Sequence, residues 1–223
     1  MGKAPVTDPV GMTEAGQPRR RPTQQRARER VERILAVASR LIAENGSEAL
    51  RMSEIVEEAG VSFGSLYQYF PDKSAIIRTL ADRYNERGHG CVAGELATVK
   101  TEADLVPAVM RITEAYYQFF LTEPVVRDIW AATQADKLLQ AVDAADTDYL
   151  AGLLCEVMQR LRPAEEPAAL ATASRLVMQL VAAAVRYAIS RDREEGDRII
   201  AMFNRSLPAD LFTLINPGDR ASV

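Results

Sequence analysis

The sequence predicts an all-α protein of about nine helices, and three observations lead to this fold class. Apolar residues recur at intervals of three and four along most of the chain, which is the spacing of an amphipathic helix. No segment alternates between apolar and polar residues as a half-buried strand does. The chain has 223 residues, of which 48% are hydrophobic and 26% charged, and these values are ordinary for a globular protein of one or two domains.

The first half of the chain is expected to hold one long helix, two short helices and a second long helix. Residues 1–18 contain several Gly and Pro and few apolar side chains, so we expect a disordered tail. A helix from Thr23 carries one apolar stripe and ends near Gly46, a residue type that closes helices. Two short helices then flank Gly60, and the longer helix that follows is expected to end at residues 88–90.

The second half of the chain is also expected to be helical. One apolar stripe runs from Leu105 to Phe120. A new helix is expected to begin after Pro124, and a later one to end before Pro163. The last long helices include one that is apolar on nearly every face, which predicts burial on all sides. The remaining expected helical ranges are 125–134, 136–161, 168–189 and 193–214.

Basic residues concentrate near the N-terminus of an acidic chain. The net charge of −4 combines +2 over residues 1–80 with −6 over residues 81–223. Seven arginines lie between Arg19 and Arg33, and three consecutive arginines before Pro22 are typical of an extended arm. This block indicates an anionic partner, for which a nucleic-acid backbone is suited. The alternative interpretation is a solvated arm that only aids solubility.

Residue types that carry metal or catalytic chemistry are scarce. His89 is the single histidine, and Cys91 and Cys155 form no C-x-x-C pair. A zinc site needs three or four clustered ligands, so we expect no metal and no cofactor, and an α-helical enzyme is the least favoured interpretation. No secretory signal is visible, and the longest apolar stretch, near 176–185, is shorter than the ~18 residues that span a bilayer. We therefore expect a cytoplasmic protein without a membrane partner and with reduced thiols.

The most specific pattern runs from Ser53 to Lys73, with the sequence SEIVEEAGVSFGSLYQYFPDK. It predicts two short helices joined by a tight turn, in which Gly60 supplies a positive φ and Ser62 caps the second helix. The second helix begins with small or polar residues, which suits a helix whose N-terminal turn approaches base edges in the DNA major groove. Two tyrosines on it can reach phosphate oxygens, and Lys73 can share a phosphate with the free N–H groups of the next helix.

These residues resemble the TetR family of one-component bacterial transcription regulators. The resemblance covers residues 34 to about 80, where AGVS, GSLY, YF and the lysine fall at the family's spacing. Met52 and Val56 depart from the hydroxyl residue and the alanine usual in the family, so a phosphate contact at position 52 must come from the backbone. The resemblance carries the family's DNA contacts onto Ser53, Ser62, Phe63, Gly64, Ser65, Tyr67, Tyr69 and Lys73. The basic arm adds Arg19, Arg20 and Arg21 to the expected DNA contacts.

The resemblance also implies a homodimer that binds double-stranded DNA at an inverted-repeat operator. We therefore divide the chain into four parts. They are a disordered tail (1–18), a helix-turn-helix DNA-binding domain with its basic arm (19–73), a larger helical ligand-binding and dimerisation domain (74–215), and a C-terminal tail (216–223). The first helix of the third part links it to the DNA-binding domain, and the last two long helices are expected at the dimer interface.

The favoured function is a repressor that a mostly apolar small molecule releases from its operator. The alternative is a DNA-binding regulator without a small-molecule effector. Aromatic and Met residues cluster where the family's pocket lies, although each of them can equally pack the core. Arg127 is suited to a ligand carboxylate, or to a surface pair with Glu123. The candidate ligand-binding residues are Met110, Tyr116, Tyr117, Phe120, Arg127, Trp130, Gln134, Tyr149 and Met158.

Overall fold

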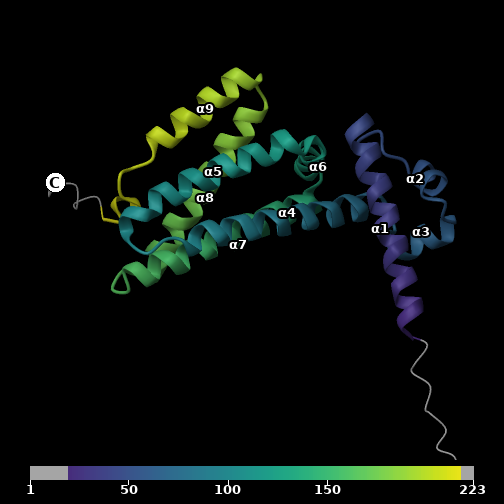
Figure 1. The fold of residues 1–223 in the computed structure, drawn as a ribbon, viewed down its shortest axis with the longest axis horizontal. Coiled ribbons are helices and arrows are strands. Elements are labelled where there is room, and N and C mark those ends of the chain that lie inside the picture. The colour runs from purple at the N-terminus through teal and green to yellow at the C-terminus, as the bar shows by residue number, and fades with distance from the viewer. Residues whose placement is uncertain (1–19, 217–223) are drawn as a thin grey trace, which may run out of the picture.

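The computed structural model describes residues 20–216, and this part of the chain forms nine α-helices and two 3₁₀ turns without a strand. The predicted all-α fold is therefore confirmed. In Figure 1, α1, α2 and α3 gather at one end, and α4 reaches from them into an elongated body formed by the other helices. The α-helices are α1 (Arg20–Asn45), α2 (Met52–Ala59), α3 (Phe63–Tyr69), α4 (Lys73–Ala97), α5 (Leu105–Thr122), α6 (Pro124–Ala135), α7 (Lys137–Leu161), α8 (Pro167–Ile189) and α9 (Arg193–Ser206). The 3₁₀ turns are η1 (Glu102–Asp104) and η2 (Leu211–Leu214). The expectations for the 1–18 tail, for Arg19 and for positions 217–223 lie outside the described residues.

Local signals in the sequence set the turn between α2 and α3. Gly60 follows α2 in the left-handed conformation, with a φ of 61°, which glycine adopts without steric cost. The Ser62 side chain accepts a hydrogen bond of 3.2 Å from the N–H of Ser65. Asp72 caps α4 in the same way by accepting from the N–H of Ala75 at 2.8 Å. Each cap satisfies an N–H that the start of a helix leaves unpaired, and the predicted helix-turn-helix geometry is confirmed.

The extended arm predicted for Arg19 to Arg21 is wrong for Arg20 and Arg21, because α1 already begins at Arg20. Pro22 lies in the first turn of the helix. The first four N–H groups of a helix have no partner within it, so a proline there removes no hydrogen bond. The backbone of both arginines therefore belongs to a helix rather than to an arm.

The end predicted for α4 at residues 88–90 is also wrong, because the helix continues to Ala97. An interior glycine costs a helix only about 1 kcal/mol relative to alanine. Burial of Val92 and Leu96 in the later turns offsets that cost, since each buried aliphatic side chain contributes about 1.5–3 kcal/mol. Tertiary packing thus keeps α4 continuous through its glycines.

The last predicted helix is shorter than expected. α9 ends at Ser206, and a separate 3₁₀ turn covers Leu211–Leu214. Pro208 lies between the two elements, and a proline lacks the N–H that would continue the helical hydrogen bonds. The Asn216 side chain donates to the Glu165 carboxylate at 3.1 Å and so ties the end of the described chain to the segment between α7 and α8.

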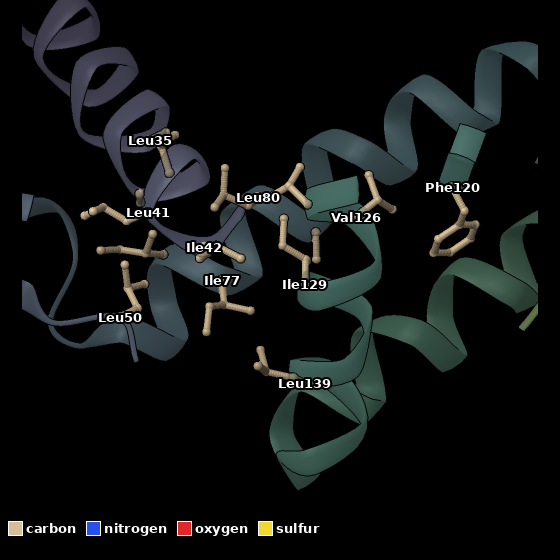
Figure 2. Close-up of a cluster of buried hydrophobic side chains, with 14 of the residues drawn as sticks. Leu35, Leu41, Ile42, Leu50, Ile77, Leu80, Phe120, Val126, Ile129 and Leu139 are labelled. Carbon is tan, nitrogen blue, oxygen red and sulfur yellow. The ribbon is translucent and has the colours of Figure 1, made fainter. Parts of the chain in front are cut away.

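One hydrophobic cluster joins the helix-turn-helix to the body of the protein. Leu35 and Ile42 of α1, Ile77 of α4 and Ile129 of α6 lie in this cluster (Figure 2), and all four side chains are almost completely buried. The first turns of α4 therefore pack into the same core as α1. The division made from the sequence ends the DNA-binding domain at residue 73 and assigns these turns to the larger domain. Movement of α4 or α6 must displace side chains that position the helix-turn-helix.

A second buried cluster fills the far part of the body. It includes Val109 of α5, Leu154 of α7 and Val177 of α8, together with Phe212 of η2. α8 is longer and more continuously apolar than the predicted stretch at 176–185, and by length and composition it is able to cross a membrane. The core helix of a globular protein has the same composition, and α8 packs against α5, α7 and α9.

Two helix-interior glycines give a matched test of this packing. A Cβ at Gly196 of α9 would overlap the Tyr117 hydroxyl and come within 2.9 Å of the carbonyl oxygen of Ala188, whereas a Cβ at Gly152 of α7 meets nothing within 4 Å. We expect Gly196→Ala to lower the free energy of unfolding by about 1–3 kcal/mol through overpacking. Gly152→Ala should raise it by up to about 1 kcal/mol, because alanine is the better helix former.

Chemical denaturation of the two variants beside the unchanged protein measures both effects. A Gly196→Ala variant as stable as the Gly152→Ala variant would contradict the close packing of α9 against α5.

Candidate DNA-binding surface and ligand cavity

The solvent-facing side of α3 carries an aromatic pair. Phe63 and Tyr67 are one helical turn apart, are 51% and 49% exposed, and stack with ring centroids 6.4 Å apart and an angle of 18° between the planes. Gly64 and Gln68 are exposed on the same helix. Large apolar side chains left open to solvent indicate an interaction surface, and a DNA major groove admits an α-helix that presents such a face.

The two serines of α3 have different surroundings. Ser62 is exposed, and its hydroxyl caps the helix. The Ser65 hydroxyl is buried and has no hydrogen-bond partner among the described residues. Leu66 beside it is fully buried and anchors α3 on the core. Tyr69 is half-buried against the same core, so its ring supports α3 as well as bordering the surface. Of the expected base contacts, Phe63 therefore lies on the exposed face, and the Ser65 hydroxyl does not.

Polar and cationic groups flank α3. Lys73 is the first residue of α4, is exposed, and donates from Nζ to the carbonyl oxygen of Glu48 at 3.2 Å. Ser53 is exposed in the first turn of α2, where Arg51 provides no side-chain cap. The open N–H groups of such a helix start favour an anion. The side chains of Arg20 and Arg21 lie outside the described part of the structure.

A cavity of about 240 Å³ lies in the body of the protein, between α4, α5, α7 and α8. Most of its wall is apolar. The apolar wall residues include Val92, Ile112, Ala115, Phe119, Leu150, Met178 and Ala182. Its polar groups make up the smaller part of the wall surface, as in pockets that bind small molecules. They comprise Asn85, Arg87, His89, Tyr116, Asp143, Asp146, Thr147 and Arg186.

A histidine–aspartate pair joins α4 to α7 at the cavity wall. His89 Nε2 lies 2.6 Å from Asp146 Oδ1, and the His89 ring packs on Tyr149 with centroids 4.3 Å apart. Burial raises the pKa of Asp146, and the hydrogen bond to His89 opposes that shift. Nearby, Asp143 accepts a hydrogen bond of 3.2 Å from Gln134 Nε2. Both cavity carboxylates therefore have donor partners.

Two arginines on the wall differ in their partners. Arg87 makes an ion pair of 2.9 Å with Glu123. The Arg186 guanidinium lies over the Trp130 ring, 5.5 Å from its centroid. Trp130 borders a smaller cavity of about 40 Å³, which shares Tyr116 with the larger one. Burial raises the pKa of Tyr116, and the nearby charge of Asp143 raises it further.

Models of two protein domains match the chain. The model described as "Bacterial regulatory proteins, tetR family" matches residues 34–80, and the model described as "Tetracyclin repressor-like, C-terminal domain" matches residues 103–215. Together they cover the helix-turn-helix and the helices around the cavity. The chain belongs to the TetR family. Its members are transcriptional regulators that bind DNA.

Individual TetR-family relatives agree with this membership. The chain is 28% identical over 141 residues to the transcriptional repressor KstR of Rhodococcus jostii, which is 63% of either chain. It is 43% identical over 57 residues to the transcriptional regulator AcrR of Shigella flexneri, which is 26% of either chain. The chain thus spans less than two thirds of the length of these curated relatives.

Solved TetR-family structures share the fold at low sequence identity. A regulator from Pectobacterium atrosepticum superposes with a TM-score of 0.62 at 17% identity, over 82% of this chain and 92% of that one. A regulator from Streptomyces coelicolor gives a TM-score of 0.60 at 21% identity, over 84% and 98% of the two chains. At such identities the likeness concerns the arrangement of helices.

The structure brings only some of the predicted ligand residues to the two cavities. Tyr116 lines both, Phe120 and Trp130 line the smaller one, and Tyr149 contacts His89 beside the larger one. Gln134 is exposed but holds the cavity carboxylate Asp143. The other predicted residues do not line either cavity. They are Met110, Tyr117, Arg127 and Met158.

The surroundings of three of these residues account for their absence from the cavities. Tyr117 faces Gly196 of α9, and Met158 is fully buried and accepts a hydrogen bond at its sulfur from Ser174. Arg127 is exposed on α6, and Glu123 pairs with Arg87 instead of with Arg127. Spacing along one helix cannot tell which neighbouring helix a face will meet.

Sequence reasoning did not select the charged residues of the larger cavity. Arg186, Asp143 and the His89–Asp146 pair all lie on its wall. One signal was available, since Arg186 interrupts a helix that is otherwise almost entirely apolar. A charge inside an apolar helix is costly unless a partner or ligand compensates it. The sequence predicts a helix end at residues 88–90, whereas His89 lies inside α4 and on the cavity wall.

Substitutions on α3 and α4 separate base recognition from backbone binding in this TetR-family chain. We expect Phe63→Ala to cost about 1–3 kcal/mol on the preferred DNA sequence and to relax base preference there. Ser65→Ala should leave base preference unchanged, because the hydroxyl is buried. Fluorescence anisotropy with the preferred site and with random duplex DNA measures both effects. Equal losses on the two DNAs for Phe63→Ala would contradict a role in base recognition.

Lys73→Met should weaken binding to all sequences alike and lower the salt dependence of the affinity, as removal of one phosphate contact does. Lys100→Met, at an exposed lysine far from α3 in the sequence, is the matched control. The same anisotropy titrations at several salt concentrations provide the measurement. An unchanged salt slope for Lys73→Met would place the lysine outside the DNA contact.

Proposed function

We propose that this protein is a cytoplasmic, homodimeric transcriptional repressor that a mostly apolar small molecule releases from an inverted-repeat operator. The observation that carries the proposal is the course of α4. Its first turn presents Lys73 beside α3, and its later turns supply Asn85, His89 and Val92 to the cavity wall. One helix thus contacts both the candidate DNA surface and the candidate ligand site. The repressor role follows from the likeness to KstR.

A second contact supports transmission between the two sites. α6 packs against α1 and α7, and the Ser74 hydroxyl near the start of α4 donates to Asp136 at the α6–α7 junction at 3.2 Å. A ligand that pushes α7 or α4 therefore changes the support of the helix-turn-helix. Release requires that the ligand bind the conformation with low DNA affinity more tightly. A tenfold loss of operator affinity needs a coupling free energy of about 1.4 kcal/mol.

The exposed side of α8 supports a dimer. Leu176, Leu180 and Tyr187 are large, about half exposed and aligned at helical spacing, and Ala183 is exposed between them. A stripe of this kind on a helix is the seam that a second helix covers. Ala182, in contrast, faces the cavity. A two-fold dimer presents two copies of α3, so its operator should be an inverted repeat.

The experiment that tests the proposal begins with selection of binding sites from random duplex DNA. Compound pools are then screened for release of the selected DNA. Recovery of an inverted repeat, and of a compound that releases it, supports the proposal. If the protein is a regulator without an effector, it will bind the repeat and no compound will release it. A chain that selects no DNA sequence would refute the proposal.

Filling the cavity should abolish the response to the effector. We expect Ala115→Trp, which places an indole in the apolar wall, to keep operator binding but to reduce effector-induced release at least tenfold, because the ligand loses its space. Ala144→Trp is the matched control on the exposed side of α7, away from the cavity. Anisotropy of labelled operator during effector titration reports the release. Normal release from Ala115→Trp would place the effector elsewhere.

A charge on the α8 stripe should break the dimer. We expect Leu180→Arg to shift the protein to monomers at micromolar concentration, because an arginine would be buried without a partner in the interface. Leu214→Arg changes an exposed leucine on η2 and serves as the control. Sedimentation velocity measures the oligomeric state of both variants. A Leu180→Arg protein that remains dimeric would exclude this face as the interface.

A further inference from the structure

The Arg186 guanidinium is a donor without an acceptor. Among the described residues it makes no ion pair and no hydrogen bond, and its contact is the face of Trp130. It is half-buried and lines the larger cavity. The other arginine of that wall, Arg87, is already neutralised by Glu123. A guanidinium carries five N–H donors and no acceptor, so only an acceptor from outside the described protein groups can satisfy Arg186.

Two further polar groups near Arg186 have no hydrogen-bond partner among the described residues, and one of them, on Trp130, borders the smaller cavity. The Trp130 Nε1–H is buried and has no hydrogen-bond partner. The Tyr116 hydroxyl, which is near enough to Asp143 and Arg186 for both charges to act on it, makes no hydrogen bond with the described residues. Buried donors without partners are rare in folded proteins and call for an explanation. A bound acceptor group that pairs with Arg186 in the larger cavity would share its wall with the Tyr116 hydroxyl.

The two carboxylates of this region, in contrast, already have donors. Asp146 is held by His89, and Asp143 by Gln134. The charged group of the wall without a partner is therefore the Arg186 guanidinium, although the carboxylates also contribute negative charge. An oxyanion of a ligand would complement the donors, and a fork of two oxygens suits a guanidinium in particular.

We propose that the cavity binds a small apolar carboxylic acid whose carboxylate pairs with Arg186 and whose aryl or acyl body packs between Val92, Ile112 and Met178. This inference rests on the proposed effector function and adds the chemical class of the effector. The cavity of about 240 Å³ is slightly smaller than the range of about 300–1,000 Å³ typical of ligand pockets. The acid is therefore compact, such as a phenylalkanoic or medium-chain fatty acid.

Two sets of probes with identical bodies and different head groups test the proposal by titration calorimetry on the full-length chain. One set is phenylbutyrate, phenylbutanol and phenylbutylamine, and the other is decanoate, decanol and decylamine. We expect at least one carboxylate to bind about tenfold or more tightly than its alcohol, because hydrogen bonds to charged groups contribute that much. Tightest binding by an amine, or no preference for either carboxylate over its alcohol, would overturn the proposal.

Variants assign the preference to Arg186. Arg186→Met should remove the preference for the carboxylate while retaining binding of the alcohol through the apolar wall. Arg127→Met removes an exposed arginine outside the cavity and should change nothing. Asp143→Asn removes a like charge and should tighten carboxylate binding several-fold. A carboxylate preference that survives in Arg186→Met would overturn the assignment, and thermal unfolding verifies that each variant is folded.

The same preparations separate this inference from the proposed function. Operator binding is measured by anisotropy with and without each probe. If the operator is bound but the carboxylates are not preferred, the inference is wrong and the DNA-binding function stands. If no DNA is bound while the binding of phenylbutyrate or decanoate still depends on Arg186, the repressor function is wrong and the carboxylate site stands.

Discussion

Apolar contact between α6 and the helix-turn-helix is the constraint on which the rest of the structure depends. Ile129 of α6 shares one buried cluster with Leu35 of α1 and Ile77 of α4. A helix of seven residues such as α3 cannot hold its own orientation, because isolated short helices are marginal in water. It is held by Leu66 and by the helices behind it. The position of the exposed aromatic pair on α3 is therefore set by the same side chains that close the body of the protein.

The cavity differs from this close-packed core, because a polar group of its wall has no hydrogen-bond partner within the described protein. Most of that wall is apolar, whereas the Arg186 guanidinium on it has no acceptor among the described residues. Such a site costs stability while empty, and a ligand that supplies the acceptor recovers that cost on binding. Ligand binding can shift a regulator between two conformations only if the ligand binds one of them more tightly, which requires that the cavity donors be placed differently in the two.

Local signals were sufficient for much of the fold and for little of the cavity. The positive φ of Gly60 and the cap at Ser62 depend on residues close in sequence, and both were predictable. The course of α4 through Gly88 was not, because it depends on the burial of later turns by other helices. The cavity combines residues from four helices, and no spacing along one chain segment reveals which faces meet. Arg186 was detectable only as an interruption of an apolar pattern.

The glycines of α4 give this helix an uneven mechanical character. The half that enters the helix-turn-helix core contains none, whereas Gly88, Gly90 and Gly94 fall in the half that borders the cavity. None of them has a neighbour within 4 Å of a Cβ position, so close packing does not require them. Glycine lowers helix stability by about 1 kcal/mol at each such position. The helix is consequently stiffer at the end that packs into the helix-turn-helix core than along the half that borders the cavity, so bending concentrates beside the cavity.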